Sequence, residues 1–311
     1  CLDKIPKSVT ILFSGYTEPF LNPECTKMIL YAHNSGYTIQ VYSTLVGMTL
    51  DDIEQFKHIP FKGFHVHLPD ASMHAKIAVN QKYITILKKL VTSNVKNLTS
   101  MSMEHCHPKI KELLENEVMI PEMVSRAGTV DIVKNDFKKI LGPISCNRAT
   151  FDRVSNNVID INVLLPNGDV ALCCMDYGLQ NILGNLLNSE YQELFESESY
   201  KTIYEKMKSY DSDIICRNCN EARPYEELNE SKQLLNNYSN DKLGLSLIKI
   251  YNNLLHRSPD PDGFNFYYEK ISKNELTISD VENAIKQSKE YQFNSPPNLI
   301  LKDSSKVGFD K

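Results

Sequence analysis

The chain has 311 residues, enough for two domains and a small third one, and its composition is that of an ordinary globular protein, with 41% hydrophobic and 23% charged residues. A formal net charge of −5 argues against a general nucleic-acid-binding protein, which would need a basic face. No apolar run reaches the roughly 18 residues that a membrane-spanning helix requires.

The first 125 residues alternate between short apolar runs and amphipathic segments. We predict strands within residues 8–15, 37–44, 63–68, 97–103 and 119–125. We predict helices within residues 24–36, 49–56, 76–91 and 108–116. Thr49 followed by Asp52 is typical of a helix start, and Gly36 is typical of a helix end. Strands separated by helices of this size imply a parallel sheet with right-handed crossovers, so the predicted fold class is α/β.

The pattern changes between residues 130 and 225. Two β-type runs flank the turn Pro166-Asn167-Gly168-Asp169, which predicts a hairpin. A helical stretch at 189–210 follows, and then the sequence CRNC at 216–219. We expect a small α+β domain here.

The C-terminal part is polar and then helical. Residues 226–242 are rich in Asn, Ser, Glu and Lys and are predicted to be a linker. In residues 243–293 the apolar side chains recur at helical spacing, with one face formed by Leu247, Ile250, Tyr251 and Leu254. We therefore predict a helical module at 243–311 whose last 18 residues are frayed.

The eight cysteines are Cys1, Cys25, Cys106, Cys146, Cys173, Cys174, Cys216 and Cys219. No secretory signal is visible, so we expect a reducing, cytoplasmic location, where cysteine sets are more often metal ligands than disulfides. Cys216 and Cys219 hold two thiolates at a separation that suits one tetrahedral ion or one iron–sulfur cube. Cys146 and one of Cys173 and Cys174 would complete four soft ligands. The spacing alone does not distinguish zinc from an iron–sulfur cluster.

Polar residues follow the first predicted strand in the sequence SGYTEP, residues 14–19. The carboxyl ends of parallel strands are where ligands bind in α/β folds. Glu18 could accept a hydrogen bond from an ammonium group. Backbone and hydroxyl groups for hydrogen bonding are offered by Ser14, Gly15 and Thr17. The alternative is an ordinary strand-to-helix turn punctuated by prolines.

Histidines and one aspartate are weaker candidates. His65 and His67 alternate with apolar residues on a predicted strand, so both face one side and either line a ligand site or fill a polar interior. The second interpretation is the simpler one. His105 and His107 flank a cysteine that strand alternation points away from both, which argues against a metal triplet. Asp70 follows a strand end and is a candidate for the pocket.

These motifs together resemble the radical S-adenosylmethionine (SAM) superfamily with a C-terminal SPASM or twitch domain. SGYTEP resembles the motif that contacts the methionine amino group of SAM. VYST at 41–44 resembles a SAM-contacting strand end, and SRAG at 125–128 resembles the position of an arginine that faces SAM. PNGDVALCCMD, with LGN at 183–185 and then CRNC, resembles the pattern that holds auxiliary 4Fe–4S clusters. The resemblance covers about residues 1–225.

The resemblance implies a division into a partial (βα)6 barrel at 1–129 that lacks its first βα unit, a SPASM or twitch domain at 130–225, the linker and the helical module. It implies that SAM is contacted by Ser14, Gly15, Thr17, Glu18, Pro19, Ser43, Thr44 and Arg126. It also implies one auxiliary 4Fe–4S cluster held by Cys146, Cys173, Cys216 and Cys219. In relatives with adjacent cysteines the first lies at the cluster, which favours Cys173 over Cys174.

The activity implied by the resemblance is generation of a 5′-deoxyadenosyl radical that oxidises or rearranges a small-molecule, sugar or peptide substrate. A reducing partner such as flavodoxin or ferredoxin would be needed, and no catalytic acid or base is predicted. The helical module resembles a domain of unknown function appended to bacterial surface-glycan proteins, so residues 243–293 are expected to bind a protein partner.

One departure from the family is serious, because its C-x3-C-x2-C loop for the SAM-binding cluster is absent and Cys1 is a lone cysteine upstream of SGYTEP. We therefore expect that loop to precede residue 1, and we expect residues 1–311 alone to be inactive. The alternative is a non-catalytic scaffold that binds zinc or an iron–sulfur cluster and recruits partners through the helical module.

Overall fold

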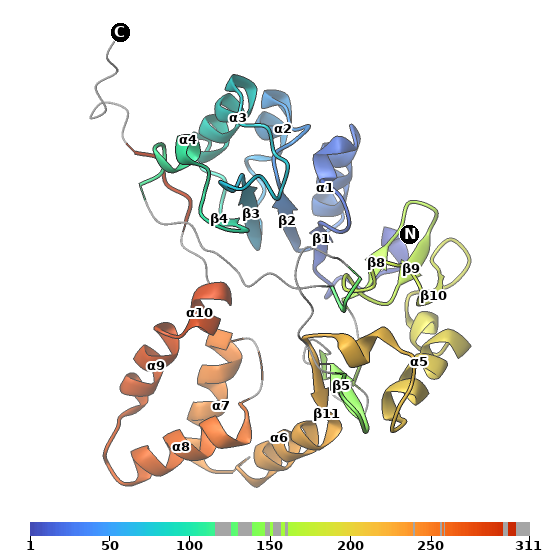
Figure 1. The fold of residues 1–311 in the computed structure, drawn as a ribbon, viewed down its shortest axis with the longest axis vertical. Helices are drawn as coiled ribbons and strands as arrows, with labels where there is room; N and C mark the ends of the chain where they lie inside the picture. The colour runs from blue at the N-terminus through green and yellow to red at the C-terminus, as the bar shows by residue number, and fades with distance from the viewer. Residues whose placement is uncertain are drawn as a thin grey trace. The chain divides into compact units, whose positions relative to one another are not determined.

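A computed structural model describes residues 1–115, 126–129, 139–146, 150–151, 157–158, 161–238, 240–255, 257, 259–294 and 298–302. The chain divides into two compact units (Figure 1). The first contains Cys1–Met123 and Pro296–Lys311, and the second is Val124–Ser295. Among the helices in these described ranges, none combines the length and the apolar character needed to cross a membrane.

A parallel four-stranded sheet forms the centre of the first unit, in the order β1-β2-β3-β4. Its strands are β1 Ile11–Phe13, β2 Ile39–Ser43, β3 Gly63–Leu68 and β4 Leu98–Ser102. The helices that alternate with them are α1 Cys25–Asn34, α2 Leu50–Phe56, α3 Gln81–Thr92 and α4 Pro108–Lys111 (Figure 1). The predicted α/β class with parallel strands is confirmed. The fifth predicted strand, 119–125, lies outside the described residues, and the partial barrel stays a prediction.

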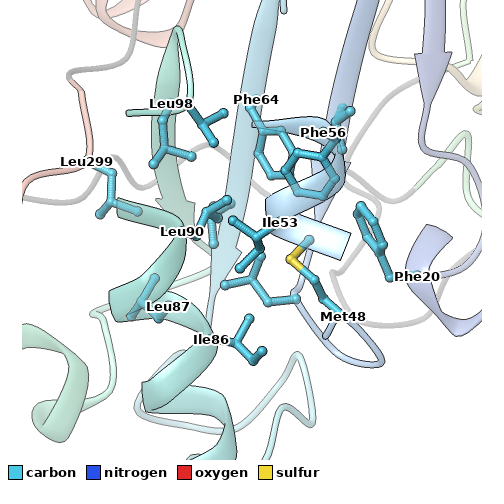
Figure 2. Packing of buried hydrophobic residues seen from close by; sticks show 14 of the residues in the cluster. Phe20, Met48, Ile53, Phe56, Phe64, Ile86, Leu87, Leu90, Leu98 and Leu299 are labelled. Atoms are coloured by element: carbon cyan, nitrogen blue, oxygen red, sulfur yellow. The ribbon is translucent and has the colours of Figure 1, made fainter. Parts of the chain in front are cut away.

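The helices of the first unit bury one face of this sheet. Phe64 on β3 packs against Phe56 at the end of α2, with ring centroids 5.5 Å apart, and against Phe61 at 5.3 Å. Figure 2 shows Phe56 and Phe64 side by side, with Ile53 and Leu90 close to them. All of these side chains are buried, so the alternate residues of β3 face the helices and His65 faces the other side.

The predicted start of α2 is confirmed by a reciprocal cap. The Thr49 hydroxyl accepts from the Asp52 backbone N–H at 3.2 Å, and the Asp52 carboxylate accepts from the Thr49 N–H at 2.8 Å. Both bonds satisfy backbone donors that the helix itself leaves unpaired. The same Asp52 also accepts from the Thr26 hydroxyl of α1 at 2.6 Å, which joins the two helices.

We expect Thr49→Ala to lower the free energy of unfolding by about 1 kcal/mol, because the substitution removes the hydroxyl that accepts from the Asp52 backbone N–H. Urea denaturation followed by circular dichroism measures the change. Thr92→Ala is the matched control, since Thr92 is an exposed residue at the other end of a helix. Equal losses in the two variants would show that the cap contributes nothing specific.

The second unit begins with short antiparallel strands. The strands β8 Val163–Leu164, β9 Asp169–Ala171 and β10 Ile182–Asn185 form one sheet in the order β10-β9-β8, and β5 Ile144–Cys146 pairs with β11 Ala222–Pro224. A further pair is β6 Thr150–Phe151 with β7 Asn157–Val158. The predicted hairpin is confirmed, and its turn requires Gly168, whose φ is +89° and whose added Cβ would lie 2.7 Å from Asn185 Oδ1. The helical segments here are η3 Gln192–Phe195, α5 Glu198–Lys208 and η4 Ile215–Asn218.

Five helices complete the second unit: α6 Tyr225–Asn237, α7 Lys242–Leu255, α8 Pro261–Ser272, α9 Ile278–Lys286 and α10 Lys289–Asn294. Their shared core contains the predicted α7 residues Leu247, Ile250 and Tyr251, with Leu254 packed against it. Residues 226–242, predicted as a linker, instead form most of α6. The reason is that Leu234 is buried in this core and the Tyr238 ring lies 4.8 Å from that of Phe264.

Part of the tail predicted to be frayed returns to the first unit. Leu299 is buried in the core of the parallel sheet. Asn298 forms a bridge with Thr99 and Leu301 forms one with Leu114, so residues 298–302 add to the edge beyond β4. The composition of the tail does not predict this contact, because the contact depends on the packing of Leu299 against a sheet that is distant in sequence. Residues 303–311 lie outside the described part of the chain.

Candidate metal centre

Four cysteines from three segments line one cavity in the second unit: Cys146, Cys173, Cys216 and Cys219. Cys146 ends β5, Cys173 follows β9, and the remaining two lie in and just after η4. The β5–β11 pairing places Ala222 opposite Cys146, and the Ala222 N–H donates to the Cys219 carbonyl at 3.0 Å. The structure therefore brings together the same four cysteines that the sequence motifs indicated.

Burial makes two of these thiols, Cys173 and Cys216, poor acids while no cation is near. It raises the pKa of Cys173 to about 12 and holds the pKa of Cys216 well above its usual value, and neighbouring thiolates raise it further. Four thiolates can share this cavity only if a bound cation compensates their charge, which is how metals deprotonate coordinating thiols. The chemistry of this donor set fits a metal centre.

Backbone N–H groups point at two of the sulfur atoms. The Glu221 N–H donates to Cys219 Sγ at 3.4 Å. Hydrogen bonds from the N–H groups of Met175 and Asp176 act against the burial that raises the pKa of Cys173. Such donors stabilise charge on a thiolate, so both loops are already shaped to hold the anionic form.

Cys174 differs from its neighbour in environment. It is half-buried, whereas Cys173 is only 7% exposed, and it is not among the residues that line the cavity. The geometry thus separates two cysteines that are adjacent in sequence.

Two supporting residues were missed by the sequence reasoning. Asp176 is fully buried and accepts from the Gln180 N–H at 3.0 Å and the Asn181 N–H at 2.7 Å, which closes the loop that follows Cys173. The signal in the sequence is an aspartate that precedes a glutamine by four residues and an asparagine by five. Arg217, between two of the cysteines, is also fully buried, and an arginine is normally expected at the surface.

The residues predicted to contact SAM divide between the two units. In the first unit, Glu18 joins the loop after β1 to the end of β2. One carboxylate oxygen accepts from the Ser43 hydroxyl at 2.8 Å and from the Phe20 N–H at 3.1 Å, and the other accepts from the Thr44 N–H and hydroxyl, the latter at 2.6 Å. A carboxylate offers about four lone-pair sites. A ligand ammonium group would therefore have to replace one of these four donors.

The other predicted residues of this loop lie on either side of Glu18. Pro19 begins the 3-10 helix η2, Pro19–Leu21, for which Glu18 is the N-cap. Ser14, Gly15 and Thr17 lie in the connection before it, where Gly15 has a φ of +130° and open space around an added Cβ. This connection leaves room beside the strand end.

Arg126 belongs to the second unit and lies against the loop that follows Cys173. Its Nη1 is 3.5 Å from the Cys174 carbonyl oxygen and 3.8 Å from Met175 Sδ, and its guanidinium lies over the Tyr177 ring at 5.8 Å. The structure thus places this arginine beside the loop that follows Cys173, one of the cysteines lining the cavity.

His65 has its hydrogen bonds satisfied within the sheet. Its ring nitrogens lie 2.8 Å from Gln40 Nε2 and 2.7 Å from Thr99 Oγ1, and it stacks on Tyr42 with centroids 4.3 Å apart. Gly63 makes room for it, since an added Cβ would lie 2.4 Å from His65 Nε2. These contacts favour the simpler interpretation, a polar interior residue. His67 differs, because its Nε2 is buried without a hydrogen-bond partner in the described part of the chain.

Burial lowers the pKa of His65 to about 4, and it lowers that of His67 as well. Because the unfolded chain binds protons near pH 6.5 and the folded chain does not, stability should fall as the pH drops from 6.5 to 4. We expect His65 to contribute at most about 3 kcal/mol to this loss, which is absent above pH 6.5. Urea titrations at pH 7.5 and pH 5 measure it, with His58→Gln at an exposed histidine as the matched control for His65→Gln. A His65 imidazole that titrates near pH 6.5 by NMR would contradict the expectation.

Asp70 caps the loop after β3. It is fully buried, and its carboxylate accepts from the His74 N–H at 2.8 Å and the Ala75 N–H at 2.9 Å. The His74 ring lies 3.2 Å from a Glu104 carboxylate oxygen, which brings three potential ligand atoms within 4.8 Å of one another. The Ser72 hydroxyl donates to the same Glu104 at 2.6 Å. Hydrogen bonds account for the position of each of these groups.

The histidines beside Cys106 do not join that group. His107 Nδ1 accepts from the Lys109 N–H at 3.3 Å and so caps α4, and the His105 carbonyl accepts from the Ala71 N–H.

Comparison with known families gives two matches. Residues 159–220 match SPASM, described as an iron–sulfur cluster-binding domain, and residues 226–294 match a domain of unknown function, DUF4214. The first range includes Cys173, Cys216 and Cys219, with Cys146 upstream of it. A search of curated proteins gives no match.

Two solved structures resemble the chain more distantly. One is BtrN in complex with AdoMet and 2-DOIA, with 16% identity, a TM-score of 0.45, and coverage of 68% of this chain and 72% of that one. The other is selenomethionine BtrN in an open conformation, with 15% identity, a TM-score of 0.37, and coverage of 68% and 71%. At TM-scores below 0.5, neither likeness assigns a fold or an activity. The family matches confirm the SPASM part of the resemblance and the appended domain: the chain contains an iron–sulfur cluster-binding domain at residues 159–220 and a domain of unknown function at residues 226–294.

Proposed function

We propose that this chain is part of a radical SAM enzyme, in which Cys146, Cys173, Cys216 and Cys219 hold one auxiliary 4Fe–4S cluster. The observation that carries the proposal is the convergence of these four thiols on one cavity, in a segment that matches an iron–sulfur cluster-binding domain. The parallel sheet of the first unit, with its polar loop after β1, supports the assignment of the remaining residues to SAM binding.

The match of residues 159–220 to an iron–sulfur cluster-binding domain supports a cube over a single zinc ion. Four thiolates by themselves would suit either group.

The protein's own contribution at this site is to hold and shield the ligands. The cysteines would supply four anionic ligands, and the N–H groups that face Cys173 and Cys219 would stabilise their charge. With four cysteine ligands, a bound 4Fe–4S cluster would have no iron position open to a substrate. When bound, the cluster would supply electron transfer, and the protein would keep water away from it through burial.

In the first unit, the proposed role of the loop at 14–19 is to orient SAM. Glu18 would hold the loop against Ser43 and Thr44 through its hydrogen bonds, and exchange of one donor would let it accept from the methionine ammonium group. Arg126, at the loop after Cys173, is proposed to face SAM as in the family. We propose a small-molecule, sugar or peptide substrate, a reducing partner such as flavodoxin or ferredoxin, and a cytoplasmic location.

The decisive experiment is anaerobic reconstitution of residues 1–311 with iron and sulfide. We expect about four irons and four sulfides per chain and brown protein, with an EPR signal after reduction. Protein that binds one zinc and no sulfide would instead support the non-catalytic scaffold. The SAM assignment has its own measurement, formation of 5′-deoxyadenosine from SAM by the full-length gene product with a reductant. Its absence in cluster-loaded protein would rule out the radical activity.

A further inference from the structure

Arg217 lies between two of the cysteines, and its side chain is 0% exposed. Arginine is almost never buried to this degree unless it is paired, because removing its charge from water is costly. Its guanidinium bonds to the Ser212 hydroxyl at 2.9 Å, to the Ile140 and Gly142 carbonyls at 2.8 Å each, to the Lys206 carbonyl at 3.1 Å and to the Ser209 carbonyl. These acceptors occupy all five N–H donors of the guanidinium.

The acceptors belong to segments that lead into the elements carrying the cysteines. Ile140 and Gly142 lead directly into β5, which ends at Cys146. Lys206 and Ser209 end α5, and Ser212 lies on the path from α5 to η4. The Ile140 N–H also donates to the Arg217 carbonyl at 3.0 Å. One residue therefore ties the strand that bears Cys146 to the turn that bears Cys216 and Cys219.

The charge of Arg217 has no carboxylate within its hydrogen bonds, because every acceptor named above is a neutral oxygen. It nevertheless acts on Asp211, whose pKa is held low chiefly by Lys139 and secondarily by this arginine. The guanidinium is held by neutral oxygens of separate segments and not by an ion pair.

We propose that Arg217 is a positioning residue for the metal centre: its guanidinium fixes Cys146 relative to Cys216 and Cys219. This inference rests on the proposed auxiliary cluster. Lysine cannot replace the arginine, since a single ammonium has three donors and cannot reach five acceptors spread over separate segments.

The test compares Arg217→Lys and Arg217→Gln with Arg223→Gln, all as residues 1–311 reconstituted with iron and sulfide. Arg223 is the matched control because it is an exposed arginine in the same unit that donates to the Asn220 and Ala222 carbonyls. Iron and sulfide per chain and the EPR line shape of the reduced cluster are measured. Amide exchange of β8–β10 and α7 reports whether the unit stays folded.

We expect Arg223→Gln to match the parent. We expect Arg217→Lys to load at least twofold less cluster with an altered EPR line shape, and Arg217→Gln to load least. Folded Arg217 variants with the parent's EPR signal would overturn the inference. Loss of amide protection throughout the second unit in Arg217→Lys would also overturn the inference. Arg217 would then stabilise the whole unit and not specifically the positions of the cysteines. A parent chain that takes up no sulfide is a different result, which counts against the proposed function instead.

Discussion

Cys173→Ser is expected to lower cluster incorporation at least tenfold, whereas Cys174→Ser is expected to leave it unchanged. Cys173 lines the cavity with the other three cysteines and is 7% exposed, while Cys174 is half-buried and outside that lining. A serine hydroxyl is a poor substitute because soft thiolates are the ligands that iron–sulfur clusters select. The two variants differ by one position and make the same chemical change, so each is the other's control.

Iron and sulfide per chain after anaerobic reconstitution measure this effect. The reverse pattern, with loss only in Cys174→Ser, would assign the ligand to the second cysteine and imply a rearranged loop after β9. Equal, undiminished loading in both variants would show that neither cysteine is required. Because Asp176 closes this loop, Asp176→Asn should weaken loading less than Cys173→Ser does, since an asparagine retains one acceptor oxygen.

Phe64→Ala is expected to lower the free energy of unfolding of the first unit by about 3–5 kcal/mol. Phe64 is fully buried on β3 and packs on the rings of Phe56 and Phe61 (Figure 2), so its removal leaves a cavity as well as lost burial. A loss of this size is a large part of the stability of a typical domain. The parallel sheet would then open far more often, and the loop held by Glu18 would open with it.

Amide hydrogen exchange at β2, β3 and β4 measures this change separately from the second unit. Phe266→Ala is the matched control, because it removes the same side chain where it is 54% exposed. We expect the control to change stability by less than about 0.5 kcal/mol. Exchange rates in Phe64→Ala that stay at the parent's values would contradict the assigned packing of this core.

Much of the local structure could be predicted because it depends on neighbours in sequence. The alternation of strand and helix in the first unit, the cap at Thr49 and the turn at Gly168 follow from side chains within a few residues of one another. The linker prediction at 226–242 was wrong about its structure for the opposite reason. Its polar composition was recognised, but the burial of Leu234 depends on helices that lie later in the chain.

The features of the metal centre likewise divide into those that the sequence predicts and those that only the structure shows. The sequence itself determined which thiols are candidates for the site, because the CRNC spacing, the cysteine pair after the hairpin turn and the lone Cys146 are visible without the structure. Only the tertiary structure decided which cysteines share a cavity, that Cys174 lies outside it, and that a buried Arg217 joins three segments across it. The physical reason is that burial and long-range hydrogen bonds form only where segments distant in sequence pack together. The hydrogen bond between Arg217 and the Ile140 carbonyl is an example.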